Sequence, residues 1–281
     1  MSGCLYIVAT PIGNLADISF RAITTLKEVD MILAEDTRHV RPLLQHYGIQ
    51  QSVQALHQHN EHKAAAYIIE KLQAGQNIAL VSDAGTPLIS DPGLPLVKLA
   101  KESGIKVIPI PGACALIAAL SASGLAVTEF SFLGFLPRTS SARKTLFEAK
   151  LLDTKTWVFY EASHRILDTL EDMAAVLAAN REIVIAREIT KLHETIVKTT
   201  VEQAVSLVRD EANMQKGEFV VIVSGAEDAP KNQTLTAEQE KILRLLLNEC
   251  STKTAASIAA EITGVRKKIL YQAALDMTES N

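Results

Sequence analysis

The sequence predicts an α/β fold, and three observations lead to this prediction. Apolar runs of strand length alternate with segments of helical period from the start of the chain to about residue 225. This alternation favours parallel strands joined by right-handed crossovers. A polar, proline-containing stretch at 225–234 precedes a last segment with the pattern of three short helices. With 281 residues, 48% hydrophobic and 21% charged, the chain has the composition of a globular protein of about two domains.

The first half of the chain predicts one sheet with helices around it. Strands are expected at 5–9, 31–34, 78–81 and 106–110, and helices near 18–28, 38–47, 61–74 and 94–103. Asp17 is the expected N-cap of the first helix. One face of that helix has the apolar spacing that lays an amphipathic helix on a sheet: Ile18, Ala22, Leu26 and Val29.

The pattern changes after residue 122, where strands follow one another with fewer helices. Strands expected at 130–135, 156–160, 182–186, 195–199 and 219–223 predict a mixed sheet. We therefore expect an N-terminal α/β domain at 1–122, a second α/β domain at 123–228 and a helical tail at 233–281. The tail has the pattern of a helix-turn-helix with Gly264 as its turn, which fits either an RNA-reading module or a stabilising appendage. Its expected packing positions are Ile258, Ile262, Val265, Leu270 and Ala274.

Residues 107–128 carry no charge and are long enough to span a bilayer. Pro109, Pro111, Gly112 and Gly124 interrupt this stretch, and Ala and Ser dominate the rest of it. The sequence therefore predicts a buried strand, a Pro-Gly turn and a short core helix, and no membrane segment.

Several classes of protein are excluded by what the sequence lacks. The formal net charge of −4 excludes a globally basic nucleic-acid coat but allows a local basic patch. Cys4, Cys114 and Cys250 lie far apart without a CxxC pair, which argues against a disulfide framework or a cysteine zinc site. No GxG, P-loop, nucleophile elbow or HExxH motif occurs. Because no basic residue precedes Arg21, secretion is not expected, and a reducing cytoplasm fits best.

Three strand exits in the first half have unusual turn chemistry, at 9–14, at 82–87 continuing to 90–93, and at 109–113. In an open α/β sheet, the loops after the carboxyl ends of the strands line the ligand crevice. Tight turns built from common turn residues are the alternative. None of the three loops contains Lys or Arg, whereas Asp83 and Asp91 are present, so phosphates match poorly. S-adenosylmethionine (SAM), with its sulfonium, amino and hydroxyl groups, fits better.

Four segments carry a resemblance to a known family: 5–18, 34–38, 134–137 and the long block Ala79-Leu-Val-Ser-Asp-Ala-Gly-Thr-Pro-Leu-Ile-Ser-Asp-Pro-Gly93. They resemble the ribosomal RNA small subunit methyltransferase I family, which belongs to the tetrapyrrole-methylase-like class III of SAM-dependent methyltransferases. The likeness runs from about residue 4 to 225. It implies a homodimer whose two α/β domains hold SAM between them, and 2′-O-methylation of a cytidine ribose in the decoding centre of 16S rRNA.

The resemblance also implies roles for single residues. It places Pro11 near the methionine part of SAM, and Asp83, Gly85 and Thr86 in the loop of the cofactor pocket. Close to that pocket it places the turn Pro111, Gly112, Ala113, Cys114 and Ala115. Cys114 stands where relatives more often have Ser, and a thiol donates a weaker hydrogen bond. The segment 187–194 resembles the family's Glu-Leu-Thr-Lys pattern, with Ile189 in place of Leu, and Val197-Lys-Thr199 stands where an Arg-Gly or His-Gly pair is commoner.

A net-negative protein that binds RNA must concentrate its phosphate contacts locally. Two basic clusters after strands could supply them, or could be solvated helix faces: Arg138, Arg143, Lys144 and Arg165. Glu35 and Arg38 are expected to project toward RNA, with helix capping by Asp36 or Thr37 as the alternative, and Lys267 and Lys268 offer contacts in the tail. His57, His59 and His62 match no metal-ligand spacing, so no metal is expected.

A ribose hydroxyl is a weak nucleophile, so its methylation needs alignment and preferably a base. Glu194, Glu161, Asp83 and Glu35 are the candidate bases, and Lys191 could stabilise the developing oxyanion. Two rival functions remain open at this point. One is a small-molecule methyltransferase of the same fold acting on a tetrapyrrole, and the other is a non-catalytic RNA-binding assembly factor.

Overall fold

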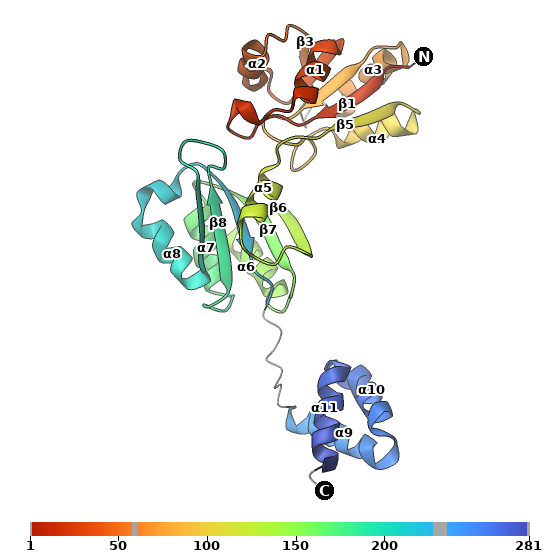
Figure 1. Ribbon diagram of the computed structural model, residues 1–281, viewed down its shortest axis with the longest axis vertical. Coiled ribbons are helices and arrows are strands. Elements are labelled where there is room, and N and C mark those ends of the chain that lie inside the picture. Colours follow the sequence, from red (N-terminus) through yellow and green to blue (C-terminus); the bar gives the residue numbers. More distant parts are fainter. Residues whose placement is uncertain (1, 58–60, 227–234, 280–281) are drawn as a thin grey trace. The chain divides into compact units, whose positions relative to one another are not determined.

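The computed structural model describes residues 2–57, 61–226 and 235–279, and it confirms the predicted α/β class (Figure 1). The chain forms two compact units, Met1–Gly225 and Ala226–Asn281. The first unit contains two five-stranded sheets with helices around them, and the second is helical. The three domain boundaries expected from the sequence stay predictions.

The first sheet is parallel throughout, in the order β3-β2-β4-β1-β5. Its strands are β1 (Cys4–Val8), β2 (Met31–Ala34), β3 (Ser52–Ala55), β4 (Ile78–Val81) and β5 (Lys106–Ile110). The sequence predicts all but β3, a short edge strand in which Ser52 and Gln54 are polar. Because β2, β4, β1 and β5 are neighbours and parallel, the loops that follow them emerge at one edge of the sheet.

Helices cover both faces of this sheet: η1 (Leu15–Asp17), α1 (Phe20–Glu28), α2 (Thr37–His46), α3 (Glu61–Gln73) and α4 (Leu94–Glu102). α1 and α2 pack with Val8, Ile32 and Val81 on one face, and α3 and α4 pack on the other. The predicted apolar face of the first helix is buried as expected. Burial on both faces explains why the strands are almost wholly apolar.

The expected N-cap of the first helix is wrong. Asp17 lies in η1, and the Ser19 hydroxyl caps α1 by accepting a hydrogen bond from the Ala22 amide at 3.1 Å. The Asn14 side chain caps the short helix η1, and Asp17 is the last residue of η1. Asp17 is therefore not available to cap α1. Asp36, in contrast, caps α2 as predicted, because its Oδ1 accepts from the Arg38 amide at 2.8 Å.

The uncharged stretch 107–128 forms the predicted strand, turn and short core helix. Its helix, α5 (Ala115–Ala122), packs on the second sheet rather than the first, against Val158, Val184 and Val220. None of the helices in the described ranges is both long enough and apolar enough to cross a membrane.

The second sheet has the order β6-β7-β10-β8-β9 and is mixed, as predicted, because only β6 and β7 pair in parallel. Its strands are β6 (Phe130–Phe135), β7 (Thr156–Ala162), β8 (Glu182–Arg187), β9 (Thr195–Thr200) and β10 (Glu218–Val223). Helices α6 (Ser140–Ala149), α7 (Ile166–Ala174), α8 (Val201–Asp210) and η2 (Ala212–Gln215) complete this layer.

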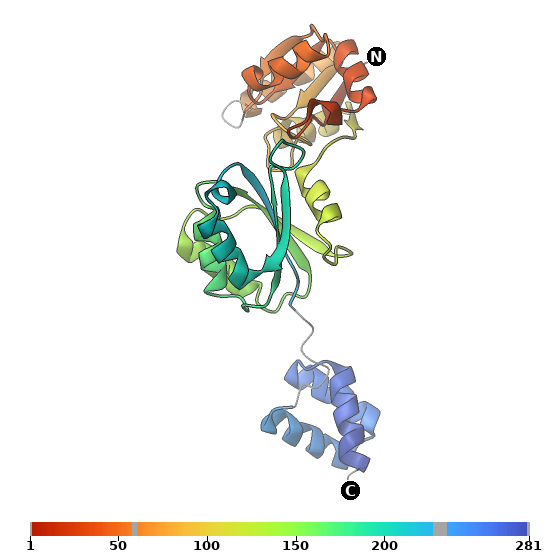
Figure 2. The same cartoon turned by 60° about the vertical axis from the view of Figure 1, so that its left-hand side comes forward.

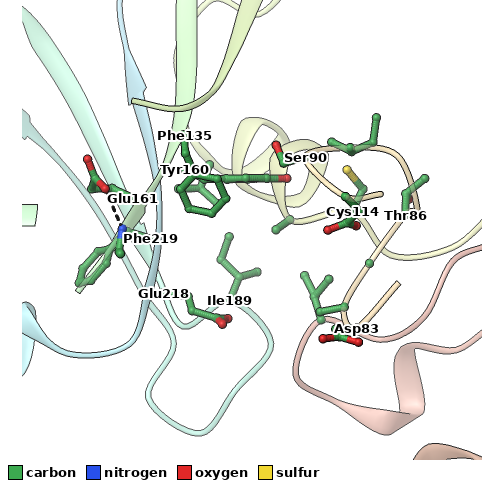
Figure 3. A pocket seen from close by; sticks show the side chains of 18 of the residues that line it. Asp83, Thr86, Ser90, Cys114, Phe135, Tyr160, Glu161, Ile189, Glu218 and Phe219 are labelled. Atoms are coloured by element: carbon green, nitrogen blue, oxygen red, sulfur yellow. Dashed lines mark hydrogen bonds between the residues drawn. The ribbon is translucent and has the colours of Figure 1, made fainter. Parts of the chain in front are cut away.

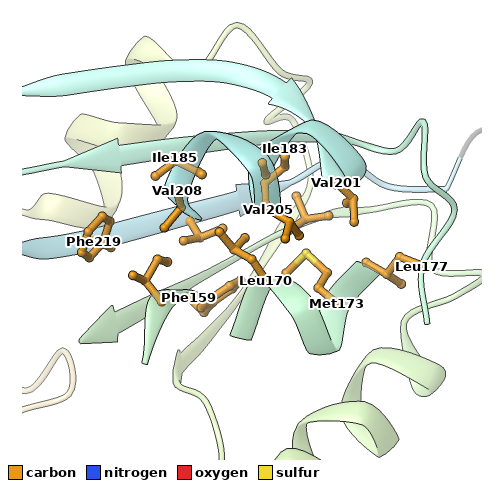
Figure 4. Close-up of a cluster of buried hydrophobic side chains, with 14 of the residues drawn as sticks. Phe159, Leu170, Met173, Leu177, Ile183, Ile185, Val201, Val205, Val208 and Phe219 are labelled. Atoms are coloured by element: carbon orange, nitrogen blue, oxygen red, sulfur yellow. The ribbon is translucent and has the colours of Figure 1, made fainter. Parts of the chain in front are cut away.

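The second sheet lies between α5 on one face and α6, α7 and α8 on the other (Figure 2). The larger core is on the side of α7 and α8, where Phe159, Leu170, Val208 and Phe219 pack together (Figure 4). Alternate residues of β7, β8 and β10 supply the two faces, and both faces are buried.

The C-terminal unit consists of α9 (Ala237–Glu249), α10 (Thr252–Thr263) and α11 (Lys267–Glu279). Gly264 ends α10 with φ of 69°, the left-handed conformation expected of the predicted turn. Leu270 and Ala274 are buried as predicted, but Ile258 and Ile262 are exposed, which corrects that expectation. Small side chains face the core of the unit instead, because α10 packs closely through Ala255, Ala256 and Ala259.

Candidate functional site

The three loops predicted to form a cleft are joined to one another. The Thr10 amide donates to the Gly85 carbonyl at 2.9 Å, and the Gly85 amide donates back at 3.1 Å. The Thr86 hydroxyl donates to the Ala113 carbonyl at 3.0 Å. At Gly112 the backbone passes so close to Ala9 that an added Cβ would lie 2.8 Å from its methyl group. The loops after β1, β4 and β5 therefore form one rigid wall.

A cavity of about 430 Å³ opens between this wall and the ends of strands in the second sheet. The wall contributes Asp83, Gly85, Thr86 and Cys114, and the second sheet contributes Phe135, Tyr160, Ile189 and Phe219 (Figure 3). Most of this lining is apolar, with a few polar groups that converge from the wall. The size and lining are those of a site for a small organic molecule.

Two loops that line the cavity contain strained backbone. Among the described non-glycine residues, those with positive φ are Leu88 and Ser90 in the loop after β4, and Glu188 and Thr190 in the loop after β8. Such conformations persist only where surrounding structure imposes them, and they concentrate at functional sites. Their restriction to these two loops supports the assignment of the cavity as the functional site.

The wall of the cavity is acidic. Glu35, Asp83 and Asp91 line it, and burial, together with the charges of Glu35 and Asp83, raises the pKa of Asp91 to about 6. Burial and the charge of Asp83 also raise the pKa of Glu35. Lys191 is the one lysine or arginine in the described lining, and two carboxylates take up its charge: Nζ lies 2.9 Å from Glu188 and 2.8 Å from Glu218. The cavity therefore favours a cationic or neutral ligand over a phosphate.

The residues expected to bind the cofactor divide into two groups. Asp83, Gly85, Thr86, Cys114 and Ala115 line the cavity. The others shape the site without lining this cavity: Pro111, Gly112, Ala113 and Pro11. Pro11 instead lines a second cavity of about 290 Å³, which shares Ile12, Asp83, Ala84, Lys191 and Glu218 with the first.

The resemblance implied that the second domain helps to hold SAM, but it did not single out the aromatic side chains that this domain contributes to the cavity, Phe135, Tyr160 and Phe219. Tyr160 accepts a hydrogen bond from the Leu116 amide at 3.2 Å, and its ring meets Phe135 edge to face, with 5.7 Å between centroids. Burial raises the pKa of Tyr160 to about 12, so its hydroxyl stays protonated. The exposed aromatic Phe135 after the glycine of 134–137 is the signal that could have indicated this side of the site.

Two of the four candidate bases, Glu161 and Glu194, accept hydrogen bonds from the chain itself. The Glu161 side chain is fully buried, between the Thr169 hydroxyl at 2.8 Å and the Arg165 Nε at 3.3 Å. The carboxylate is thus held by the chain itself, although the residue lines the cavity, and its role as a base stays a prediction. Glu194 is exposed and accepts a hydrogen bond from the Thr190 amide at 2.6 Å, so it closes the loop after β8.

The basic residues expected to contact phosphates fall into two groups, those bonded to other parts of the chain and those with accessible side chains. Arg143 is buried, with Nε donating to Asp172 at 2.8 Å and a terminal nitrogen donating to the Arg138 carbonyl at 2.9 Å. Arg165 donates to the carbonyls of Leu136 and Pro137 at 2.9 and 2.7 Å. The burial of the Arg143 guanidinium corrects the expectation for that residue. The Arg165 side chain is 17% exposed, and its contact with RNA stays a prediction. Among the expected basic contacts, those with accessible side chains are Arg38, Arg138, Lys144, Lys267 and Lys268.

The remaining predicted residues are the charged residues around the start of α2 and the histidines at 57–62. Arg38 pairs with Asp36 at the start of α2 while remaining largely exposed, and Glu35 faces the cavity. His59 lies outside the described residues, and no cluster of potential metal ligands occurs in the described part of the chain.

Comparison with known proteins is consistent with this geometry. The model of the family Tetrapyrrole (Corrin/Porphyrin) Methylases matches residues 4–205, and that of the RsmI C-terminal HTH domain matches residues 233–278. The chain is 52% identical to the Ribosomal RNA small subunit methyltransferase I of Haemophilus influenzae, over 97% of this chain and 96% of the relative. It is 49% identical to the protein of that name from Pseudomonas aeruginosa, over 98% and 97% of the two chains.

Solved structures with lower identity show the fold. Cobalt precorrin-4 methyltransferase aligns with a TM-score of 0.58 and 17% identity, over 78% of this chain and 94% of its own. Diphthine synthase aligns with a TM-score of 0.60 and 15% identity, over 79% and 90% of the two chains. Uroporphyrin-III C-methyl transferase from Thermus thermophilus, complexed with S-adenyl homocysteine, aligns with a TM-score of 0.54 and 16% identity, over 79% and 97%.

Proposed function

Because the chain belongs to the ribosomal RNA small subunit methyltransferase I family, we propose that it methylates the 2′-oxygen of a cytidine ribose in the decoding centre of 16S rRNA, with SAM as methyl donor. The observation that carries the proposal is that about half of the residues are identical to those relatives over nearly the whole of both chains. That span includes the cavity loops and the C-terminal unit together.

The cavity fits SAM by size and charge. A volume of about 430 Å³ with apolar walls suits its adenosine, and three carboxylates suit its sulfonium and amino groups. We expect Asp83 to accept from an amine or hydroxyl of SAM, and the backbone of 85–86 and 113–115 to bind its polar edges. When bound, SAM supplies an electrophilic methyl group, and the chain's part is to exclude water and align the ribose oxygen.

Two rival functions remain to be separated from this one. A tetrapyrrole methyltransferase shares the fold. Its substrate is small, however, so the exposed basic residues and the C-terminal helical unit would have no role in binding it. A non-catalytic assembly factor would bind RNA without SAM, and the acidic cavity argues against it. Titration of the protein with SAM distinguishes the second rival, since the assembly factor predicts no binding.

The proposed partner is the small ribosomal subunit, bound by a local positive surface. On a chain with net charge −4, phosphate contacts must come from exposed side chains: Arg38, Arg138, Lys144, Lys267 and Lys268. Because its substrate is ribosomal, we place the enzyme in the cytoplasm.

We also propose that the protein acts as a homodimer, as the family resemblance implies. Apolar side chains on α5 and β6 are exposed, among them Ile117 at 54% and Phe130 at 39%, and exposed apolar surface of this kind marks association sites. Light scattering of the purified chain should give the dimer mass, and Ile117→Glu should lower it. A monomer at working concentration contradicts this part of the proposal.

The function is tested by mapping ribose methylation in rRNA from a strain that lacks the gene. One cytidine in 16S rRNA should lose its 2′-O-methyl group and regain it when the gene is restored. An unchanged methylation map would contradict the proposal.

A further inference from the structure

His39 and Asp83 form an imidazole–carboxylate pair at the rim of the site. The Asp83 Oδ2 lies 3.0 Å from the His39 Nδ1, and the Asp83 Oδ1 accepts from the Asp36 amide at 3.0 Å. Both contacts hold the carboxylate at the N-terminus of α2. A carboxylate facing Nδ1 selects the tautomer that carries its proton there, which leaves Nε2 with a free lone pair.

The pair sits where the two cavities meet. Asp83 lines both cavities, whereas His39 lines only the second, together with Gly13, Leu15 and Pro42. The His39 side chain is 68% exposed, so a large substrate can reach it from solvent. A ribose in the second cavity would lie next to the cofactor cavity, with the imidazole beside it.

Three of the acid–base candidates, Glu161, Glu194 and Lys191, are less suited to remove a proton from the ribose. Glu161 is fully buried, and Glu194 is tied to the Thr190 amide. Lys191 is held by two carboxylates, whose bonds outweigh burial and raise its pKa, so it stays protonated. His39 is a base whose ordinary pKa lies near neutrality and whose partner orients it.

We propose that the second cavity receives the target ribose and that His39 is the general base of the methyl transfer, oriented by Asp83. This inference rests on the proposed function. Nε2 takes the proton of the 2′-hydroxyl while a lone pair of that oxygen forms the bond to the methyl carbon. The carbon–sulfur bond of SAM breaks, and its electron pair stays on sulfur, which becomes a neutral thioether. The imidazolium then returns its proton to water.

The charges around His39 set the direction of the pH dependence. The hydrogen bond that His39 donates to Asp83 and the charge of that carboxylate raise the pKa of His39, and Asp36 adds to this effect, whereas Arg38 opposes it. Glu35, Lys191 and Glu218 also face this region from the first cavity and from the loops of the second sheet. The base form is the neutral one, so kcat should rise with pH through the pKa of His39 and then level off.

The test compares His39→Gln with His46→Gln, an exposed histidine two turns away on the same helix. The substrate is the small subunit from a strain lacking the gene, at saturating SAM. His39→Gln should lower kcat by about 10²- to 10⁴-fold, abolish the rise with pH, and leave the dissociation constants of SAM and of the subunit unchanged. His46→Gln should behave as wild type.

An unchanged kcat and pH profile in His39→Gln overturns the proposal, and so does a loss of kcat that parallels weaker SAM or subunit binding. Inactivity of the wild-type protein would instead count against the proposed function. NMR of labelled histidine in the wild-type protein gives a readout independent of activity. It should show the proton on Nδ1 of His39 and a pKa above the ordinary value, and Asp83→Asn should lower that pKa. A His39 signal with its proton on Nε2 overturns the proposal.

Discussion

Asp91 shows how a single residue can link cofactor binding to pH. Burial and the carboxylates of Glu35 and Asp83 raise its pKa to about 6, so its charge is lost as the pH falls through that value. Binding of a cation would favour the charged form and release a proton near pH 6. This coupling follows from the crowding of carboxylates in the cavity and does not need any conformational change.

We therefore expect SAM affinity to fall by about three- to tenfold between pH 8 and pH 5, which corresponds to about one unit of pKa shift on binding. Titration calorimetry in buffers of different ionisation heat measures both the affinity and the proton release. Asp91→Asn should remove most of the dependence and leave a smaller part from Glu35. Affinity that is independent of pH in the wild-type protein would contradict the account.

Arg143 and Arg138 lie five residues apart and make a matched pair for separating structure from RNA binding. Removal of the buried Arg143 guanidinium leaves the Asp172 carboxylate with only Lys144 and the Ser140 hydroxyl as partners, at a cost of about 3 kcal/mol in unfolding free energy. Arg138→Ala removes an exposed side chain and should change stability by less than about 0.5 kcal/mol, but should weaken binding to the small subunit. Urea unfolding and subunit binding measure the two effects. The assignment fails if Arg143→Ala is as stable as Arg138→Ala.

These two arginines also show what could be predicted for single residues. That the loops after β1, β4 and β5 lie together was predictable, because parallel neighbouring strands end at the same edge of a sheet. This placement follows from the backbone and does not depend on how individual side chains pack. Whether Glu161 or Arg143 faces solvent or core depends on partners such as Thr169 and Asp172, which are distant in the sequence. Local patterns hold no information on those pairs.

At the level of elements, the site depends on close approach between loops. Thr86 and Ala113 are joined by a hydrogen bond, and Gly112 passes against Ala9 with no room for a methyl group. The sequence predicted the loops because proline and glycine mark them. It did not predict β3, or the packing of α5 on the second sheet, because short elements have weak periodicity and their partners are set by tertiary contacts.

Gly112→Ala should displace the 111–115 loop and weaken SAM binding. Gly104→Ala is the control, because Gly104 has φ of 70° and no atom within 4 Å of an added Cβ. Its left-handed conformation costs about 1 kcal/mol of stability with any other residue but leaves the cavity unchanged. Thermal unfolding and SAM titration of both variants separate the two effects. Equal SAM affinity in the two variants would show that the approach at Gly112 does not shape the site.

At the level of the whole molecule, the C-terminal unit has its own core and is joined through a polar segment. Leu243, Ala259 and Leu270 are fully buried within it, so the unit does not need the rest of the chain to cover its apolar face. The polar composition of 225–234 is the reason for expecting a separate helical segment after it. The apolar pattern alone misassigned Ile258 and Ile262, because close helix packing favours alanine over larger side chains.

Truncation after residue 226 should leave SAM affinity unchanged and raise the small-subunit concentration needed for half-maximal activity. Lys267 and Lys268 add modest contacts that weaken with salt, so the difference should shrink as salt increases. Full activity of the truncated chain at physiological salt would refute a docking role for the unit. Loss of SAM binding would refute its independence.

Transfer of labelled methyl groups from SAM by the purified chain, followed by nucleoside analysis, shows which molecule and which atom the protein methylates. Small subunits lacking the modification and a tetrapyrrole are offered in parallel reactions. We expect label in 2′-O-methylcytidine from 16S rRNA and none in the tetrapyrrole. Label on a base, or on the tetrapyrrole instead of the RNA, would contradict the proposed function.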